Sequence, residues 1–216
     1  MDQYPWIDYE PQAGDVLGFS DHTLVSSIIE LGTWTWPGTG LSHVGIVAHM
    51  RQDGPPSSLV LFESVMEGHF PCLIQGKVVG GVQAQPLFDR ILTHPGNVWL
   101  YRPNPTLSRA DRRQLTRFCK AKIGTPYDWR GAFDARETIV GWLLHALVLH
   151  EDLAKQYCSE FVADALRSID YLEATNVSVL SPNRLVWLMA QQGIVQPRAR
   201  IKRANQVFPT LPPQEE

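Results

Sequence analysis

The hydrophobic pattern of this chain changes its period at Ser108. Before that residue, short runs of apolar and β-branched residues are separated by polar turns, which predicts strands that pair antiparallel. After it, apolar residues recur at helical spacing. The sequence therefore predicts an α+β fold in which an antiparallel sheet packs against helices. The predicted strands cover residues 15–19, 43–50, 59–65, 78–85 and 97–102.

Four helices are predicted after the strands, and an earlier one over residues 24–32. Ser108 and Asp111 match a capping box at the start of the first of the four, which ends near Gly124. The second covers residues 132–149, and the third begins near Cys158. Ser181 as N-cap and Pro182 at the first helical position begin the fourth. The third helix carries one apolar face made of Phe161, Val162, Ala165, Leu166 and Ile169.

The size of the chain fits one compact domain. Its 216 residues are 44% hydrophobic and 19% charged, which is an ordinary globular balance. We expect this domain to cover residues 1–197 and a flexible, basic and proline-rich tail to cover residues 198–216. The net charge of −3 gives no basic field, so the sequence argues against nucleic-acid binding by bulk electrostatics.

The N-terminal sequence lacks the basic start and apolar stretch of a secretory signal. The most apolar run, residues 139–149, is shorter than the roughly 20 residues that cross a bilayer. Three widely spaced cysteines make neither a disulfide framework nor a paired zinc knuckle. We therefore expect a chain that is cytoplasmic as synthesised, in a reducing compartment and without a transmembrane segment.

Cys158 is the candidate nucleophile because it is predicted in the first turn of an amphipathic helix. The dipole and the free N–H groups at that end of a helix stabilise a thiolate. The alternative interpretation is that Cys158 is a small core residue, which is the usual place of a free cysteine.

His43 and Glu63 are the candidate partners of that thiolate, as base and as the group that orients the imidazole. His43 begins one predicted strand, and Glu63 follows three apolar residues on the next, where a buried carboxylate needs a partner. A structural histidine bonded to a carbonyl, and a glutamate facing solvent on an edge strand, are the alternatives. His49, Glu67 and His69 are further polar candidates.

The segment from Ile123 to Phe133 is predicted to be a loop with two aromatic residues, Tyr127 and Trp129. Such a loop could line a substrate cleft, with the Tyr127 hydroxyl donating to a developing oxyanion. The alternative is a turn with an anchoring aromatic side chain.

Three short stretches, LSHVGIV, GTPYDWRG and YCSEFV, resemble in their order the circularly permuted branch of the NlpC-type papain-like cysteine hydrolases. The resemblance implies a papain-like fold with Cys158 as nucleophile, His43 as base and Glu63 as orienting group. It also implies an oxyanion or substrate-binding role for Tyr127, Ser159 and Trp129. Arg130 departs from the common pattern, and so does the long apolar insertion before Cys158. That insertion could roof the cleft and favour an acyl substrate, or pack into the core.

These features together predict a hydrolase that cleaves amides through an acyl-enzyme, with no metal or organic cofactor. The resemblance implies a peptide bond of bacterial peptidoglycan as substrate. An enzyme without a signal would then reach the wall by a phage or specialised secretion route, with a delivery or immunity protein as partner. The alternatives are a lipid N-acyl amidase, thioesterase or acyltransferase, and a non-catalytic phage structural or binding module that keeps the fold.

Overall fold

A computed structural model describes residues 9–20, 40–51, 58–66, 68, 70–125, 157–173 and 180–206. The helices predicted over residues 24–32 and 132–149 lie outside these ranges, as does the predicted loop from Tyr127 to Phe133. Among the described residues, no helix is long and apolar enough to cross a bilayer.

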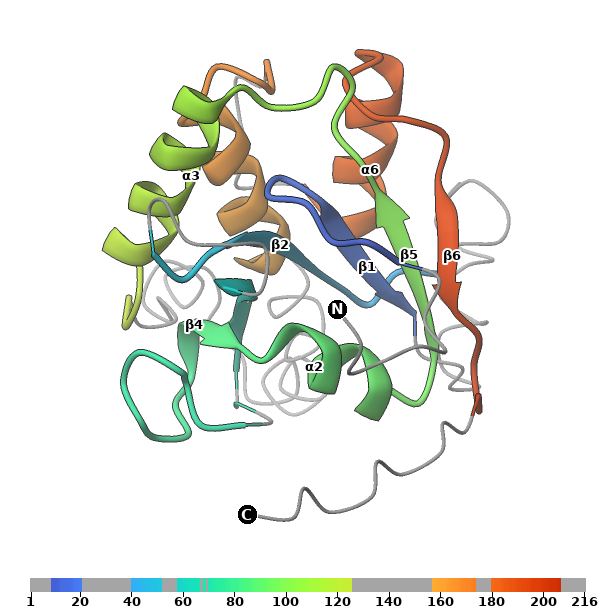
Figure 1. Cartoon of the computed structure of the whole chain (residues 1–216). Helices are drawn as coiled ribbons and strands as arrows, with labels where there is room; N and C mark the ends of the chain where they lie inside the picture. The colour runs from blue at the N-terminus through green and yellow to red at the C-terminus, as the bar shows by residue number, and fades with distance from the viewer. Residues whose placement is uncertain are drawn as a thin grey trace, which may run out of the picture.

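The centre of the fold is a six-stranded sheet in which every pair of neighbouring strands is antiparallel. The strand order is β4-β3-β2-β1-β5-β6, so the first three strands along the chain lie side by side (Figure 1). The chain is thus an α+β protein with an antiparallel sheet, as the sequence predicts. The strands are β1 Val16–Ser20, β2 His43–His49, β3 Leu59–Val65, β4 Gly81–Gln85, β5 Asn97–Tyr101 and β6 Ala199–Lys202.

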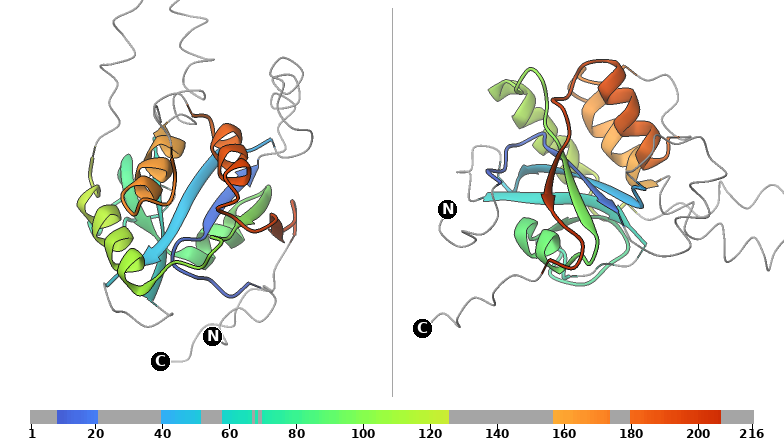
Figure 2. Two further views of the ribbon diagram at one scale, coloured as in Figure 1. Left: turned by 90° about the horizontal axis from the view of Figure 1, so that it is seen from above. Right: turned by 90° about the vertical axis from the view of Figure 1, so that its right-hand side faces the viewer.

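Alternation along each strand divides the buried side chains between the two faces of the sheet. In β2, Val44 and Ile46 belong to one core cluster, whereas Val47 belongs to the other. The first cluster is shared with α3, α6 and a helix over residues 157–167, and the second with the short helix α2. Figure 2 shows the three longer helices on one side of the sheet and α2 on the other.

The helices around the larger core begin as their sequences predict. Helix α3 (Arg109–Ala121) starts with a full capping box between Ser108 and Asp111. Helix α6 (Pro182–Gln191) has Ser181 as N-cap, whose hydroxyl accepts from the Arg184 N–H. In the helix over residues 157–167, the predicted apolar face is buried.

Three elements differ from the sequence prediction. Helix α2 (Leu87–Thr93) was not predicted, because a helix of two turns offers little periodic signal. Residues 199–202 form the edge strand β6 and not the start of a flexible tail, because Ile201 packs on the smaller core and Lys202 is buried. Strand β4 begins at Gly81, three residues later than expected, since a turn occupies the preceding segment.

Candidate active site

His43 is the first residue of β2 and lies opposite Phe19 of β1. Their rings are 5.7 Å apart between centroids. Because side chains of directly opposed residues share a face, His43 starts on the α2 face of the sheet, with Phe19. The imidazole is 15% exposed, so it is held at the rim of the core and is not sealed inside it.

Glu63 lies in the middle of β3 with a fully buried side chain. Its Oε2 is 2.8 Å from Nε2 of His43. A carboxylate can only accept, so Nε2 carries a proton and donates it to this bond. The other ring nitrogen, Nδ1, is thereby left for a second partner.

Arg90, on helix α2, completes the environment of the carboxylate. Its Nε donates to Oε1 of Glu63 at 3.2 Å, and its guanidinium lies 4.5 Å from the centre of the Phe19 ring. One carboxylate oxygen thus faces the arginine and the other the histidine. Arg90 was not predicted as a site residue because α2 was not predicted. Leu87 and Ile91, at i and i+4 after Pro86, give only a weak helical signal in a segment of this length.

The pKa values of this pair are shifted in opposite directions. Burial alone would raise the pKa of Glu63, but the charge of Arg90 and the hydrogen bond and charge of His43 lower it to about 2. Burial alone would lower the pKa of His43, but the charge and side-chain hydrogen bond of Cys158, followed by those of Glu63, raise it to about 9. At neutral pH the carboxylate is therefore ionised and the imidazole is protonated.

Cys158 is the second described residue of the helix over residues 157–167 and belongs to the larger core cluster. Its side chain hydrogen-bonds the imidazole of His43, so helix and sheet meet at the start of β2. The cysteine has no exposed surface. The structure thus brings Cys158, His43 and Glu63 together.

The other predicted site residues do not join this group in the described part of the chain. The Ser159 hydroxyl donates to the carbonyl of Leu180, just before α6, so it is engaged in holding two helices together. His49 faces Ser58, with Nδ1 3.2 Å from Oγ. Tyr127, Trp129, Glu67 and His69 lie outside the described residues.

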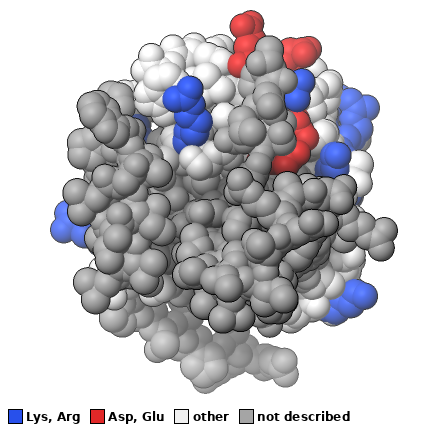
Figure 3. Space-filling view, turned by 180° about the vertical axis from the view of Figure 1, so that it is seen from behind, with Lys and Arg blue, Asp and Glu red and all other residues white. Residues whose placement is uncertain are grey.

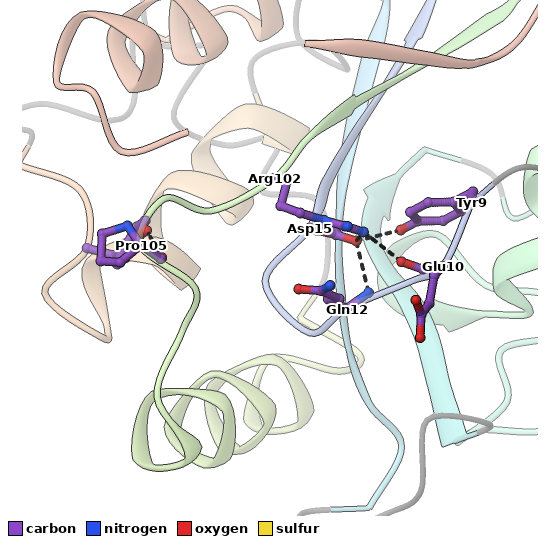
Figure 4. A network of polar contacts seen from close by, with 7 residues as sticks. Tyr9, Glu10, Gln12, Asp15, Arg102 and Pro105 are labelled. Carbon is purple, nitrogen blue, oxygen red and sulfur yellow. Dashed lines mark hydrogen bonds and ion pairs between the residues drawn. The ribbon is translucent and has the colours of Figure 1, made fainter. Parts of the chain in front are cut away.

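A second buried carboxylate, Asp15, precedes β1 and holds a separate network (Figure 4). Its oxygens accept from the Tyr9 hydroxyl at 2.9 Å and from the Gln12 N–H at 2.9 Å. The guanidinium of Arg102 donates to both oxygens at 3.0 Å and also to the carbonyl of Glu10. This network fastens residues 9–12 to the sheet.

Among the described residues, no group of three or more histidine, cysteine, aspartate or glutamate side chains is arranged to hold a metal ion. On the face drawn in Figure 3, the described basic side chains are spread out and not gathered into one patch.

The fold and the site define an α+β protein with a cysteine, histidine and glutamate in contact. No family model matches the sequence, and no curated protein matches it. Among solved structures, the chain is similar to one described as metalloprotein yiiX from Escherichia coli O157:H7, DUF1105. The two are 20% identical over 91% of this chain and 92% of that one, with a TM-score of 0.46, which is too low to carry a function across.

These comparisons overturn the family assignment made from the sequence. The assignment to the circularly permuted NlpC-type hydrolases is wrong, since no family model, that of these hydrolases included, matches the sequence. The three motifs behind the assignment are short stretches around His43, Tyr127 and Cys158. Such stretches reflect the local needs of a site and do not specify the ancestry of the whole chain.

Proposed function

We propose that this protein is a cysteine hydrolase that cleaves amide bonds with Cys158 as nucleophile, His43 as acid and base, and Glu63 as the orienting group. One observation carries the proposal: the His43 imidazole contacts both the Cys158 thiol and the Glu63 carboxylate. A buried thiol at an imidazole held by a carboxylate is the arrangement that thiol catalysis requires. The nucleophile on a helix beside a sheet that carries the base is papain-like in this sense.

The arrangement supports a two-step reaction. The Cys158 thiolate attacks the carbonyl carbon, and the carbon–nitrogen bond breaks as the imidazolium of His43 gives its proton to the leaving amine. A water molecule then attacks the thioester while His43 takes its proton. The carbon–sulfur bond breaks, the carboxylic acid leaves, and the thiolate and imidazolium are restored.

Glu63 acts on the imidazole through both its position and its charge. Its bond to Nε2 leaves Nδ1 for the thiol, and its negative charge stabilises the protonated ring. Arg90 fixes the other oxygen, which prevents the carboxylate from rotating away. The same two contacts make the neutral, protonated form of Glu63 unfavourable, so the carboxylate stays charged at neutral pH.

The substrate follows less directly from the site. The peptidoglycan peptide was implied by the family resemblance, so it loses that support and stays a prediction. An N-acyl amide is the second substrate class, because it presents the same carbonyl carbon and leaving nitrogen. Turnover of muropeptides against turnover of acyl amides, followed by mass spectrometry of the products, separates the two.

Replacement of the nucleophile tests the reaction itself. We expect Cys158→Ala to lower kcat by about 10⁴-fold or more, because the variant lacks the sulfur that forms the acyl-enzyme. Cys119→Ala is the matched control, since Cys119 is also fully buried in the same core and burial raises the pKa of its thiol. Full hydrolysis by the Cys158 variant would disprove the proposal.

Thiol labelling tests the pair without a known substrate. All three cysteines are fully buried, so exposure alone does not distinguish them. We expect iodoacetamide to modify Cys158 first at pH 6 to 7, where ordinary thiols are protonated, and much more slowly in His43→Ala. Equal labelling of Cys72, Cys119 and Cys158 in both proteins would favour a non-catalytic binding module.

A further inference from the structure

The segment before β4 carries a concentration of exposed apolar side chains. Leu73 is 45% exposed, Ile74 40% and Val78 53%. In the described part of the chain, every large hydrophobic side chain that is exposed lies in this segment. We refer to residues 71–79 as the apolar turn. In Figure 1 it projects from the body of the protein beside β4.

The backbone of the apolar turn is firmly held. Gly76 donates to the carbonyl of Cys72 at 2.8 Å, and Cys72 donates to that of Lys77 at 2.9 Å. Gly76 has a φ of +68°, a conformation that glycine adopts at little cost. The Leu73 N–H donates to the carbonyl of Ala84 at 2.9 Å, and through this bond the turn lies along the outer edge of β4. The apolar side chains therefore project from a rigid support.

The apolar turn carries one charged residue, Lys77, and it is positive. No acidic residue stands between Glu67 and Asp89, and Lys77 is exposed at the tip. The exposed Lys120 and Lys122, at the end of α3, lie on the same side, since Gly124 closely approaches Gln75 of the turn. Glu160 interacts with Lys122 and offsets part of its charge, so Lys77 is the cleaner electrostatic probe.

We propose that the apolar turn inserts Leu73, Ile74 and Val78 into the interface of an anionic lipid bilayer, with Lys77 at the level of the head groups. A projecting tip of aliphatic side chains with lysine beside it suits the headgroup and acyl boundary, because the lysine stem lies along apolar surface while its ammonium meets lipid charge. A protein partner fits less well. Stable protein interfaces cover about 800 Å² on each side and depend on aromatic and arginine anchors. The apolar turn contains no aromatic residue and no arginine.

Vesicle sedimentation of the full chain tests this assignment. We expect binding to vesicles of phosphatidylcholine mixed with phosphatidylglycerol, and much weaker binding to phosphatidylcholine alone. Leu73→Ser combined with Val78→Ser should weaken binding about tenfold or more, since two half-exposed aliphatic side chains lose their transfer into lipid. Lys77→Gln should weaken it about fivefold, which corresponds to the loss of one basic residue near an anionic surface.

Two controls make the result specific. Arg203→Gln removes one positive charge just beyond β6, at the opposite edge of the sheet, and should leave binding unchanged. Cys158→Ala should bind vesicles as the wild type does, so the outcome is independent of the proposed hydrolase activity. Leu73, Lys77, Val78 and Arg203 are exposed, so their substitutions should leave the fold intact. Circular dichroism verifies the fold of every variant, including that of the buried Cys158→Ala.

Three outcomes would overturn the proposal. The first is that the wild type does not bind the mixed vesicles. The second is that the wild type and the Leu73→Ser, Val78→Ser variant bind them equally. The third is that the wild type does not bind vesicles but forms a concentration-dependent dimer, which this variant abolishes. The last would assign the apolar turn to contact between two copies of the chain.

Discussion

Asp15 and Glu63 are both fully buried carboxylates beside the same sheet, and each is bound by an arginine. Asp15 accepts four hydrogen bonds, from Tyr9, Gln12 and both donor nitrogens of Arg102. Glu63 accepts one from Arg90 and one from His43. The partners of Asp15 hold the chain around β1 and β5, whereas one of the two partners of Glu63 is an imidazole that also contacts a thiol.

The comparison teaches where to look for chemistry in a buried network. A buried ion pair by itself indicates only that a charge has been compensated, and it is a weak sign of function. At Asp15 every contact ends on a group that fixes the chain. At Glu63 the contact continues through the imidazole to Cys158, so a change in the carboxylate is transmitted to a reactive atom. Substitutions at the two carboxylates should therefore affect different measurements.

Of the substitutions at the two carboxylates, Glu63→Gln is expected to have the largest effect. The amide can still hold the ring in place, but it cannot stabilise an imidazolium as a carboxylate does, so we expect kcat to fall about 10³-fold to 10⁴-fold. Steady-state hydrolysis of the identified substrate measures this change. The variant should remain folded, because glutamine has the same shape as glutamate and can still accept from Arg90.

The matched substitution at the other carboxylate shows whether this loss is specific. Asp15→Asn should leave kcat of the folded protein within about twofold of the wild type. Equal kcat values for the Glu63→Gln variant and the wild type would transfer the orienting role to another residue.

The second effect is on stability and falls on Asp15→Asn. The substitution removes the charge that compensates Arg102 and places an NH₂ group among hydrogen-bond donors. We expect the free energy of unfolding to fall by about 3 kcal/mol, at the lower end for a broken buried pair because Arg102 is 21% exposed. Urea denaturation followed by circular dichroism measures it. An unchanged free energy of unfolding would mean that the network contributes nothing to the fold.

The sequence predicted much of what surrounds the site, because those parts depend on local patterns. The strand over residues 59–65 has the predicted bounds, and the caps Ser108 and Ser181 are used as expected. His43, Glu63 and Cys158 could be predicted from their positions in the sequence. A carboxylate after three apolar residues needs a buried partner, and the first turn of a helix stabilises a thiolate. Their mutual contact stays a property of the fold, which no spacing in the sequence specifies.

Other parts could not be predicted because tertiary contacts decide them. Arg90 acts from a short helix that is stabilised by packing on the sheet and has little periodic signal of its own. The arginine-rich segment around Arg200 looked like a solvated tail, yet pairing with β5 makes it an edge strand. Arg198 and Arg200 lie over the ring of Trp99, a contact between distant parts of the chain.

The third effect is a loss of activity at high pH that depends on Glu63. The pKa of His43 is raised from 6.5 to about 9, so the imidazolium persists up to that pH and is lost above it. We expect kcat/KM to fall about tenfold per pH unit above roughly pH 9, as the proton needed by the leaving amine disappears. In Glu63→Gln this limit should move to lower pH, because the carboxylate charge helps to raise the pKa.

The same shifts predict how stability depends on pH. The raised pKa of His43 contributes stability that is complete below about pH 6.5 and is lost as the pH rises through about 9. The lowered pKa of Glu63 contributes stability that is present above about pH 4.5 and is lost as the pH falls toward about 2. Both contributions are complete between about pH 4.5 and pH 6.5, so the free energy of unfolding should be greatest in that range. If kcat/KM has the same high-pH limit in the wild type and in Glu63→Gln, the Glu63 carboxylate does not raise the pKa of His43.

The smallest effect tests how far the Asp15 network extends. Tyr9→Phe removes the hydroxyl that donates to Asp15 and keeps the ring, whose centroid is 6.5 Å from that of Phe88. Three donors to the carboxylate remain, so we expect the free energy of unfolding to fall by only about 1 kcal/mol, with kcat and its pH profile unchanged. Urea denaturation and steady-state kinetics on the same preparation measure both. In the Asp15→Asn background the Tyr9→Phe change should cost less, because its acceptor is already altered. A fall in kcat would instead mean that the two carboxylates are coupled through the sheet, and the division between a structural and a chemical network would have to be abandoned.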